Sequence, residues 1–130
     1  MVNKKKIYAV DTGIVNAVSF QFSENKGRLL ENAVFLELKR RYKDIYYFEG
    51  KNECDFIIKS GRTITQAIQV ADSLSEPKTR KREIEGLFSA MDFFDLKKGC
   101  IITSDTEEHL KKDNKHIIII PFWKWSLEAT

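Results

Sequence analysis

The stretch ECDFIIKSGRTITQAIQVA, residues 53–71, decides the fold. It contains two runs rich in Ile, Val and Thr, residues 53–59 and 63–71, which are joined by the turn-forming residues Ser60-Gly61-Arg62. Such runs with a short connection predict two neighbouring antiparallel strands. The run at 44–49 and the turn at 50–52 precede them, so we predict a meander of three strands.

Helical patterns flank this meander on both sides. Residues 27–42 are rich in Leu, Glu, Lys and Arg, which favour a helix. A second helix is predicted to begin with Ser75 as its N-cap and Pro77 in its first turn, and to close with Lys97 and Lys98 near its C-terminus and Gly99 just after it. Further strands are predicted at 6–10, 100–103 and 115–121, with a turn at 11–13 and a last turn of helix at 123–127. The order indicates an α/β fold with a mixed sheet.

The composition agrees with one globular unit, residues 1–130, in a reducing environment. A chain of 130 residues has room for a single core. The two cysteines, Cys54 and Cys100, are too few for a disulfide framework, and no apolar run reaches the ~20 residues of a membrane span. We therefore expect a cytoplasmic protein without membrane contact. The net charge of +3 permits nucleic-acid binding without requiring it.

The first predicted helix places a carboxylate inside its apolar stripe. With about 100° per residue, four neighbours lie within about 60° of Glu31 on the helical wheel: Val34, Phe35, Leu38 and Tyr42. A carboxylate held against apolar groups costs free energy unless a metal, a cation or a hydrogen-bond donor pairs with it. Glu31 is therefore a candidate functional residue. The alternative is a glutamate at the edge of the stripe that reaches solvent or caps another element.

A second set of polar residues lies in the predicted meander. Strand alternation puts Glu53, Asp55 and Ile57 on one face and Cys54, Phe56 and Ile58 on the other, and in the next strand Ala67, Gln69 and Ala71 share a face. Asp55 and Gln69 are then expected on the same side of neighbouring strands, where a packed helix would bring Glu31 to them. Carboxylate and amide oxygens suit a hard divalent cation. The alternative is a polar face in solvent.

Five short strings along the chain resemble a known domain. They are DTG at 11–13, KGRLLEN at 26–32, ExDF at 53–56, IQV at 68–70 and PFWKW at 121–125. Together they resemble the C-terminal, nuclease-like domain of prokaryotic AAA+ ATPases. That domain is similar to the PD-(D/E)XK nuclease superfamily, which has a restriction-endonuclease-like core of order α-β-β-β-α-β. The order predicted from residue 27 onward matches this core.

The resemblance implies a role for each candidate residue. Glu31 matches the helical acid, Asp55 the metal-binding aspartate, and Gln69 the acid of the second motif, so that the three would bind Mg²⁺ or Mn²⁺ for DNA phosphodiester cleavage. Ala71 stands where the motif lysine positions the attacking water, which implies a weakened or inactive centre. Lys39, about 80° from Glu31 on the same helix, is the candidate substitute lysine, and Lys78 and Lys81 at the start of the second helix could also reach the site. The alternative for each of these lysines is a solvent-facing role.

A basic cluster opens the second predicted helix: Lys78, Arg80, Lys81 and Arg82. Cations at a helix N-terminus oppose the helix dipole, so phosphate contacts are one reason for their position. The neighbouring Glu83 and Glu85 dilute the cluster, and the alternative is a solvated face. His109 and His116 lie in polar surroundings and are expected to be ordinary surface residues.

Two functions from different classes follow. The first is a nuclease-fold domain associated with DNA, catalytically weakened because of Ala71, and dependent on Mg²⁺ or Mn²⁺ if it is active. The alternative is a non-catalytic interaction or dimerisation domain that partners an AAA+ ATPase. The chain has no GxxxxGK[ST] phosphate loop, so an ATPase module would lie outside it.

Overall fold

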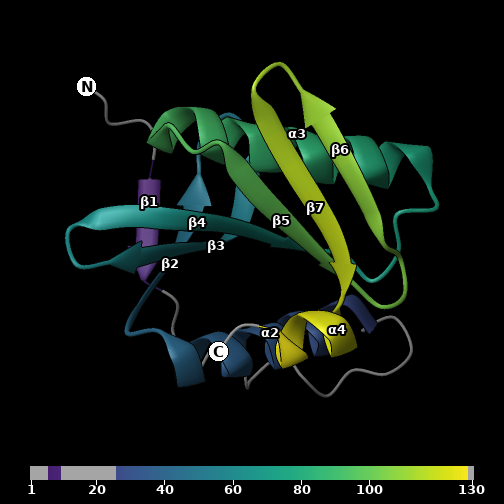
Figure 1. Cartoon of the computed structure of the whole chain (residues 1–130), viewed down its shortest axis with the longest axis horizontal. Helices are drawn as coiled ribbons and strands as arrows, with labels where there is room; N and C mark the ends of the chain where they lie inside the picture. Colours follow the sequence, from purple (N-terminus) through teal and green to yellow (C-terminus); the bar gives the residue numbers. More distant parts are fainter. Residues whose placement is uncertain (1–5, 10–25, 129–130) are drawn as a thin grey trace.

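The computed structural model describes residues 6–9 and 26–128. The elements follow one another in the order β-α-β-β-β-α-β-β-β-α (Figure 1). Their bounds are β1 Lys6–Ala9, α2 Lys26–Arg41, β2 Asp44–Glu49, β3 Glu53–Ser60, β4 Thr63–Val70, α3 Pro77–Phe94, β5 Lys98–Thr103, β6 Glu108–Lys112, β7 Lys115–Pro121 and α4 Phe122–Leu127. The chain is therefore an α/β domain in which a helix, three strands and a second helix lead into three further strands.

The strands form a seven-stranded mixed sheet in the order β1-β2-β3-β4-β5-β7-β6. Strands β2 to β4 are antiparallel neighbours, as the predicted meander requires, β1 adds to β2 in the antiparallel sense, and β4, β5 and β7 run parallel. A parallel pair needs a crossover connection, which α3 supplies between β4 and β5. The tight turn between β3 and β4 contains Gly61 at a φ of +65°, a conformation that glycine adopts without strain.

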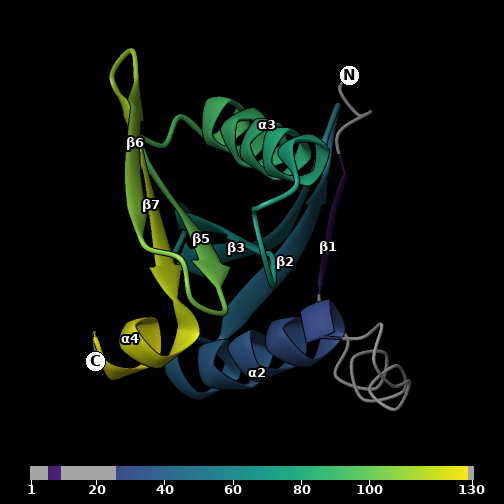
Figure 2. The ribbon, with the colours of Figure 1, turned by 90° about the vertical axis from the view of Figure 1, so that its right-hand side faces the viewer.

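Helices cover both faces of the sheet (Figure 2). Helix α3 packs on one face over a core that includes Ile57, Leu87 and Met91. Helices α2 and α4 pack on the other face over a second core that includes Phe35, Phe56 and Trp125. Because each strand of a two-sided sheet contributes alternate residues to opposite faces, these two cores fix which side chains meet which helix.

The structure adds one strand to the sequence-based prediction and moves both ends of α3. Strand β6 is not expected from the sequence, because its residues EHLKK are polar and only Leu110 joins a core. Helix α3 is capped at Glu76 instead of Ser75, and ends at Asp95 in the left-handed conformation instead of near Gly99. Gly99 lies inside β5, where a Cβ would stand 2.7 Å from the Met91 sulfur, so close packing of α3 explains this glycine.

Three other expectations concern the N-terminal strand, the cysteines and membrane spans. Val10, predicted as the end of the first strand, and the turn at 11–13 lie outside the described residues. Cys54 and Cys100 are both free thiols. Within 6–9 and 26–128, the structure has no helix of the length and apolarity needed to cross a membrane.

Candidate functional site

Four side chains form a polar centre where β3 and β4 pass between α2 and α3. Glu31 comes from α2, Asp55 from β3, Gln69 from β4 and Glu83 from α3. Gln69 is only 3% exposed, and the three carboxylates are partly buried. We call these four residues the polar centre. It includes the three residues that the sequence singles out and one, Glu83, that sequence reasoning treats only as a neighbour of basic residues.

The amide oxygen and both amide protons of Gln69 bond to main-chain groups. Its Oε1 accepts a hydrogen bond from the backbone N–H of Asp55 at 2.8 Å, and its Nε2 donates to the carbonyl oxygens of Glu53 and Glu83, each at 3.0 Å. Both amide protons are therefore used, as a buried polar side chain requires. Gln69 thus connects three elements, β3, β4 and α3, through one side chain.

Gly86 allows α3 to approach this amide. A Cβ at position 86 would lie 2.2 Å from the Glu53 carbonyl oxygen and 2.6 Å from Gln69 Nε2. Only a glycine leaves room for that carbonyl and that amide against the helix. Sequence reasoning missed Gly86, although a glycine in the middle of a helix, where it costs about 1 kcal/mol relative to alanine, is a recognised signal for a packing constraint.

Asp55 lies at an irregularity in the sheet. Tyr46 pairs with Ile57 and Phe48 with Cys54, so three steps along β3 oppose two along β2. This bulge corrects the predicted alternation, because Cys54 packs with Ile57 in the core under α3 instead of with Phe56. The Asp55 carboxylate uses Oδ2 to accept a hydrogen bond from the backbone N–H of Val70 at 2.9 Å across the strand gap.

Burial raises the pKa values of the three carboxylates of the polar centre. Burial raises the pKa of Asp55 well above its ordinary value, the nearby charge of Glu31 raises it further, and the hydrogen bond from Val70 lowers it. Burial also raises the pKa of Glu31, with repulsion from Glu83 as the next cause. The pKa of Glu83 is raised by burial, and its partner Arg82 lowers it. Ionising the carboxylates of the polar centre in the folded state therefore costs free energy.

The predicted triad draws its residues from elements on both faces of the sheet. Ala67 and Ala71 share the face of Gln69 and lie in the core under α3, whereas Ile68 and Val70 lie in the core under α2. Glu31 belongs to α2, the helix on the other face, and its charge acts on Asp55. In the described part of the chain, no group of three or more His, Cys, Asp or Glu side chains is placed to hold a metal ion.

The two candidate lysine positions lie apart from the polar centre. Ala71 is 7% exposed in the core under α3, and its N–H donates to the carbonyl of Ile102 at 3.0 Å. Lys39 is exposed on α2, eight residues and therefore about 12 Å along the axis from Glu31. The side chain of Lys39 would need to span two helical turns to reach the carboxylates.

The basic cluster at the start of α3 is partly neutralised. Arg80 forms two hydrogen bonds, of 2.9 and 3.0 Å, with the carboxylate of Glu108 on β6, and Arg82 pairs with Glu83 at 3.4 Å. Lys78 and Lys81 are exposed. The four residues therefore share one end of α3, but only the two lysines present charges without an ion-pair partner in the described ranges.

The polar centre opens to the surface through a pocket of about 340 Å³. Three of its four members line this pocket, together with Glu53 and the main-chain turn before β3. Two cations, Lys51 and Arg82, also line it. The site can thus exchange protons and small ions with solvent, and its own two cations offset part of the negative charge.

Comparison with known proteins gives a family and a relative. The family model described as a domain of unknown function, DUF4143, matches residues 26–125. An uncharacterized protein of Methanocaldococcus jannaschii is 41% identical over 140 residues, a match that covers 97% of this chain and 30% of that protein. The chain thus spans about a third of the length of this relative. No solved structure matches the chain.

Proposed function

This chain belongs to the DUF4143 family of domains of unknown function, and we propose that it is a DNA-associated domain of the PD-(D/E)XK nuclease type whose catalytic centre has become structural. One observation carries the proposal. Gln69 stands at the position where the nuclease motif has an acid. Its amide oxygen accepts a hydrogen bond from a backbone N–H, and both of its amide protons are donated to backbone carbonyls. A side chain used in this way holds the fold together instead of binding a catalytic ion.

The donor set supports the loss of metal chemistry. A Mg²⁺ or Mn²⁺ ion takes several oxygen ligands that converge on one point. Glu31 comes from α2 and Gln69 from a strand position that faces α3, and the Gln69 oxygen already accepts the Asp55 N–H. The residues present therefore do not fit the ion. At the motif-lysine position, the buried Ala71 supplies no amine to orient a water molecule.

Two further observations support the nuclease-type ancestry and a longer parent chain. The order α2-β2-β3-β4-α3-β5 matches the α-β-β-β-α-β order of the superfamily core. The match to the archaeal relative leaves most of that protein outside the compared region. We place the proposed AAA+ ATPase module there.

The test combines metal binding with DNA cleavage. Mn²⁺ is titrated into the wild-type domain and into Asp55→Asn in a calorimeter, and both samples are incubated with supercoiled plasmid in 5 mM Mn²⁺ or Mg²⁺. We expect no nicking by either protein and no heat that depends on Asp55. Nicking by the wild type that Asp55→Asn abolishes would refute the proposal. Asn keeps an oxygen for the Val70 N–H, so this variant preserves the local hydrogen bond.

A second candidate function rests on exposed apolar side chains. Leu29 and Leu36 on α2 are 51% and 54% exposed, and Trp123 and Leu127 on α4 are 61% and 77% exposed. The spacings of seven and four residues place each pair on one helix face, and α2 and α4 are in contact. An apolar face of this kind fits a protein-interaction domain.

Light scattering after size exclusion tests this second candidate for self-association. A mass that doubles with concentration, and returns to that of one chain in Leu36→Glu, would indicate dimerisation through this face. A single-chain mass at every concentration would leave the rest of the longer protein as the partner to test. That test is co-purification of the domain with the ATPase module, and its failure would refute the second candidate.

A further inference from the structure

A basic row crosses three adjacent strands on the α2 side of the sheet. The strand register places Lys98 of β5 opposite His116 of β7, and His116 opposite Lys111 of β6. Residues paired across strands project to the same face, and neighbouring strands lie about 4.8 Å apart. The backbones of Lys98 and Lys111 are thus about 10 Å apart. The next row along the strands is Cys100, Ile118 and His109.

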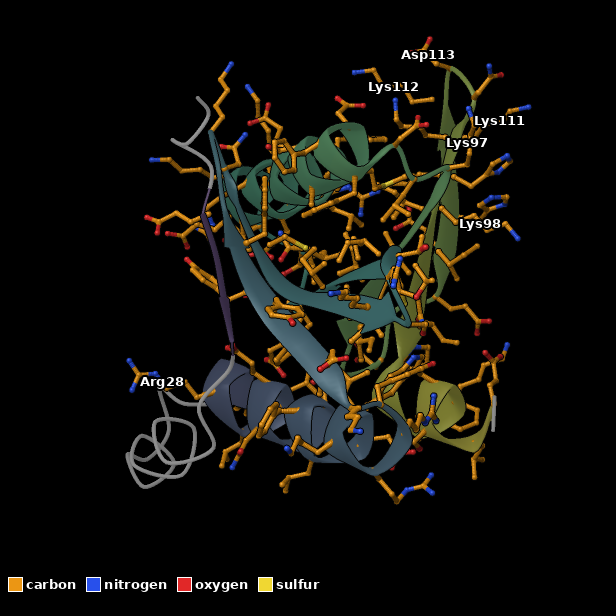
Figure 3. The ribbon with its side chains drawn as sticks, turned by 90° about the vertical axis from the view of Figure 1, so that its left-hand side faces the viewer. Arg28, Lys97, Lys98, Lys111, Lys112 and Asp113 are labelled. Atoms are coloured by element: carbon orange, nitrogen blue, oxygen red, sulfur yellow. The ribbon has the colours of Figure 1, made fainter. Side chains whose placement is uncertain are left out.

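None of the helices in residues 26–128 covers this part of the sheet face. Figure 1 shows α2 and α4 at one end of the sheet and the β6–β7 turn at the other. Lys98, Lys111 and His109 are exposed, and Ile118 is 39% exposed although it points toward the α2 side. In Figure 3, Lys97, Lys98, Lys111 and Lys112 gather at one corner of the molecule.

The lysines of this corner differ in how they are neutralised. Within the described ranges, no carboxylate lies at ion-pair distance from Lys97, Lys98 or Lys111. Lys115, close by on β7, pairs with Asp92 at 2.6 Å. We call Lys97, Lys98 and Lys111, together with His109 and His116, the basic corner. Its charge is available to a ligand, unlike that of Arg80 and Arg82.

The basic corner also offers flat rings and a hollow. His109 Nε2 lies 3.0 Å from His116 Nδ1, and the two rings are stacked, with centroids 5.2 Å apart and an angle of 20° between their planes. A pocket of about 350 Å³ adjoins the row, and Lys98 and Ile118 are among its lining residues, with Tyr42, Gln66 and Trp125. Cations beside flat rings and a hollow are the features with which proteins hold a nucleic-acid backbone and its bases.

We propose that the basic corner is the surface that binds the phosphate backbone of DNA. This inference rests on the proposed association with DNA and assigns it to a surface. It also moves the interaction away from the start of α3, where the sequence pattern places it. Two of the four cations there are paired with carboxylates, whereas the three lysines of the basic corner are exposed without an ion pair in the described part of the chain.

Binding of fluorescein-labelled DNA, measured by anisotropy between 50 and 200 mM salt, tests the assignment. Both a duplex and a single-stranded oligonucleotide are used as probes. The test variant is Lys97→Gln/Lys98→Gln/Lys111→Gln, and the matched control is Lys39→Gln/Lys78→Gln/Lys81→Gln, which removes three exposed lysines elsewhere. We expect the affinity of the test variant to fall more than tenfold. For the duplex, the slope of log K against log salt should fall by about 2 to 3, close to 0.9 for each phosphate that is no longer neutralised.

The outcomes separate this inference from the proposed function. Tight binding by the wild type that the control variant weakens as strongly as the test variant would refute the basic corner and keep the DNA association. No binding by the wild type at 50 mM salt would refute the association itself. Tighter binding of poly-glutamate than of DNA at equal charge concentration would indicate an acidic protein segment as the ligand and would also refute the assignment. Circular dichroism of each variant verifies that it is folded.

Discussion

Replacing Gly86 by alanine should destabilise the domain although alanine is the better helix former. Gly86 lies in the middle of α3, where the exchange alone would stabilise a helix by about 1 kcal/mol. The new methyl group, however, would stand 2.2 Å from the Glu53 carbonyl oxygen and 2.6 Å from Gln69 Nε2. Because one of these neighbours is backbone and the other is a buried, hydrogen-bonded amide, neither can move without breaking hydrogen bonds.

The magnitude follows from three contributions. Overpacking a buried position costs about 1–3 kcal/mol. Displacing the Gln69 amide leaves a buried carbonyl without its donor, at about 1–3 kcal/mol. Subtracting the gain of about 1 kcal/mol in helix propensity leaves a decrease of about 1–5 kcal/mol in the free energy of unfolding.

Urea unfolding followed by circular dichroism measures this decrease, with Gly27→Ala as the matched control. Gly27 also lies in a helix, but a Cβ there would have no atom within 4 Å, so the control should be neutral or slightly stabilised. If Gly86→Ala were as stable as Gly27→Ala, the close approach of α3 to β3 and β4 would be wrong. The structural role given to Gln69 would then lose its main support.

Three further outcomes are expected from the same unfolding measurement. Gln69→Glu should lower the free energy of unfolding by about 2–4 kcal/mol at neutral pH, because an ionised carboxylate cannot donate to the two main-chain carbonyls; unchanged stability would contradict their importance. Asp55→Asn should be more stable than the wild type at pH 7. Burial and the charge of Glu31 raise the pKa of Asp55 in the folded state, so its contribution to wild-type stability should increase as the pH falls and level off below about 3.8, the ordinary pKa. The difference in free energy of unfolding between Asp55→Asn and the wild type should therefore shrink as the pH falls. A difference that grew would contradict the raised pKa of Asp55. Leu38→Ala should cost about 2–5 kcal/mol and Leu36→Ala less than about 1, since the former is buried and the latter 54% exposed; equal costs would refute the packing of α2.

The sequence predicts the elements whose side chains alternate or repeat regularly. The meander around Gly61 and both long helices are found close to the predicted bounds, because local propensity and burial agree there. Strand β6 could not be predicted, because a polar edge strand is held by its pairing with β7 and carries almost no apolar pattern. The bulge at Asp55 is also a tertiary feature, since no single residue marks it.

The candidate site shows the same division. The sequence indicates that Asp55 and Gln69 lie on neighbouring strands, which they do. The sequence could not indicate that the Gln69 amide hydrogen-bonds to backbone groups, because one of them is the carbonyl of Glu83 on α3. The one feature of the sequence that indicates this close packing is Gly86, a glycine within a predicted helix. The His109–His116 pair, predicted as two independent surface residues, depends on the register of β6 and β7.

The three hydrogen bonds of Gln69 have an evolutionary consequence. A glutamate at this position would place a fourth carboxylate beside three that already repel one another, and it would remove the donors on which two carbonyls depend. A lysine at position 71 would enter a core that now holds a buried alanine. Either substitution alone would lower the stability of the fold, whereas the nuclease motif needs both. Selection for a stable fold alone therefore opposes a return of this sequence to the nuclease motif that it resembles.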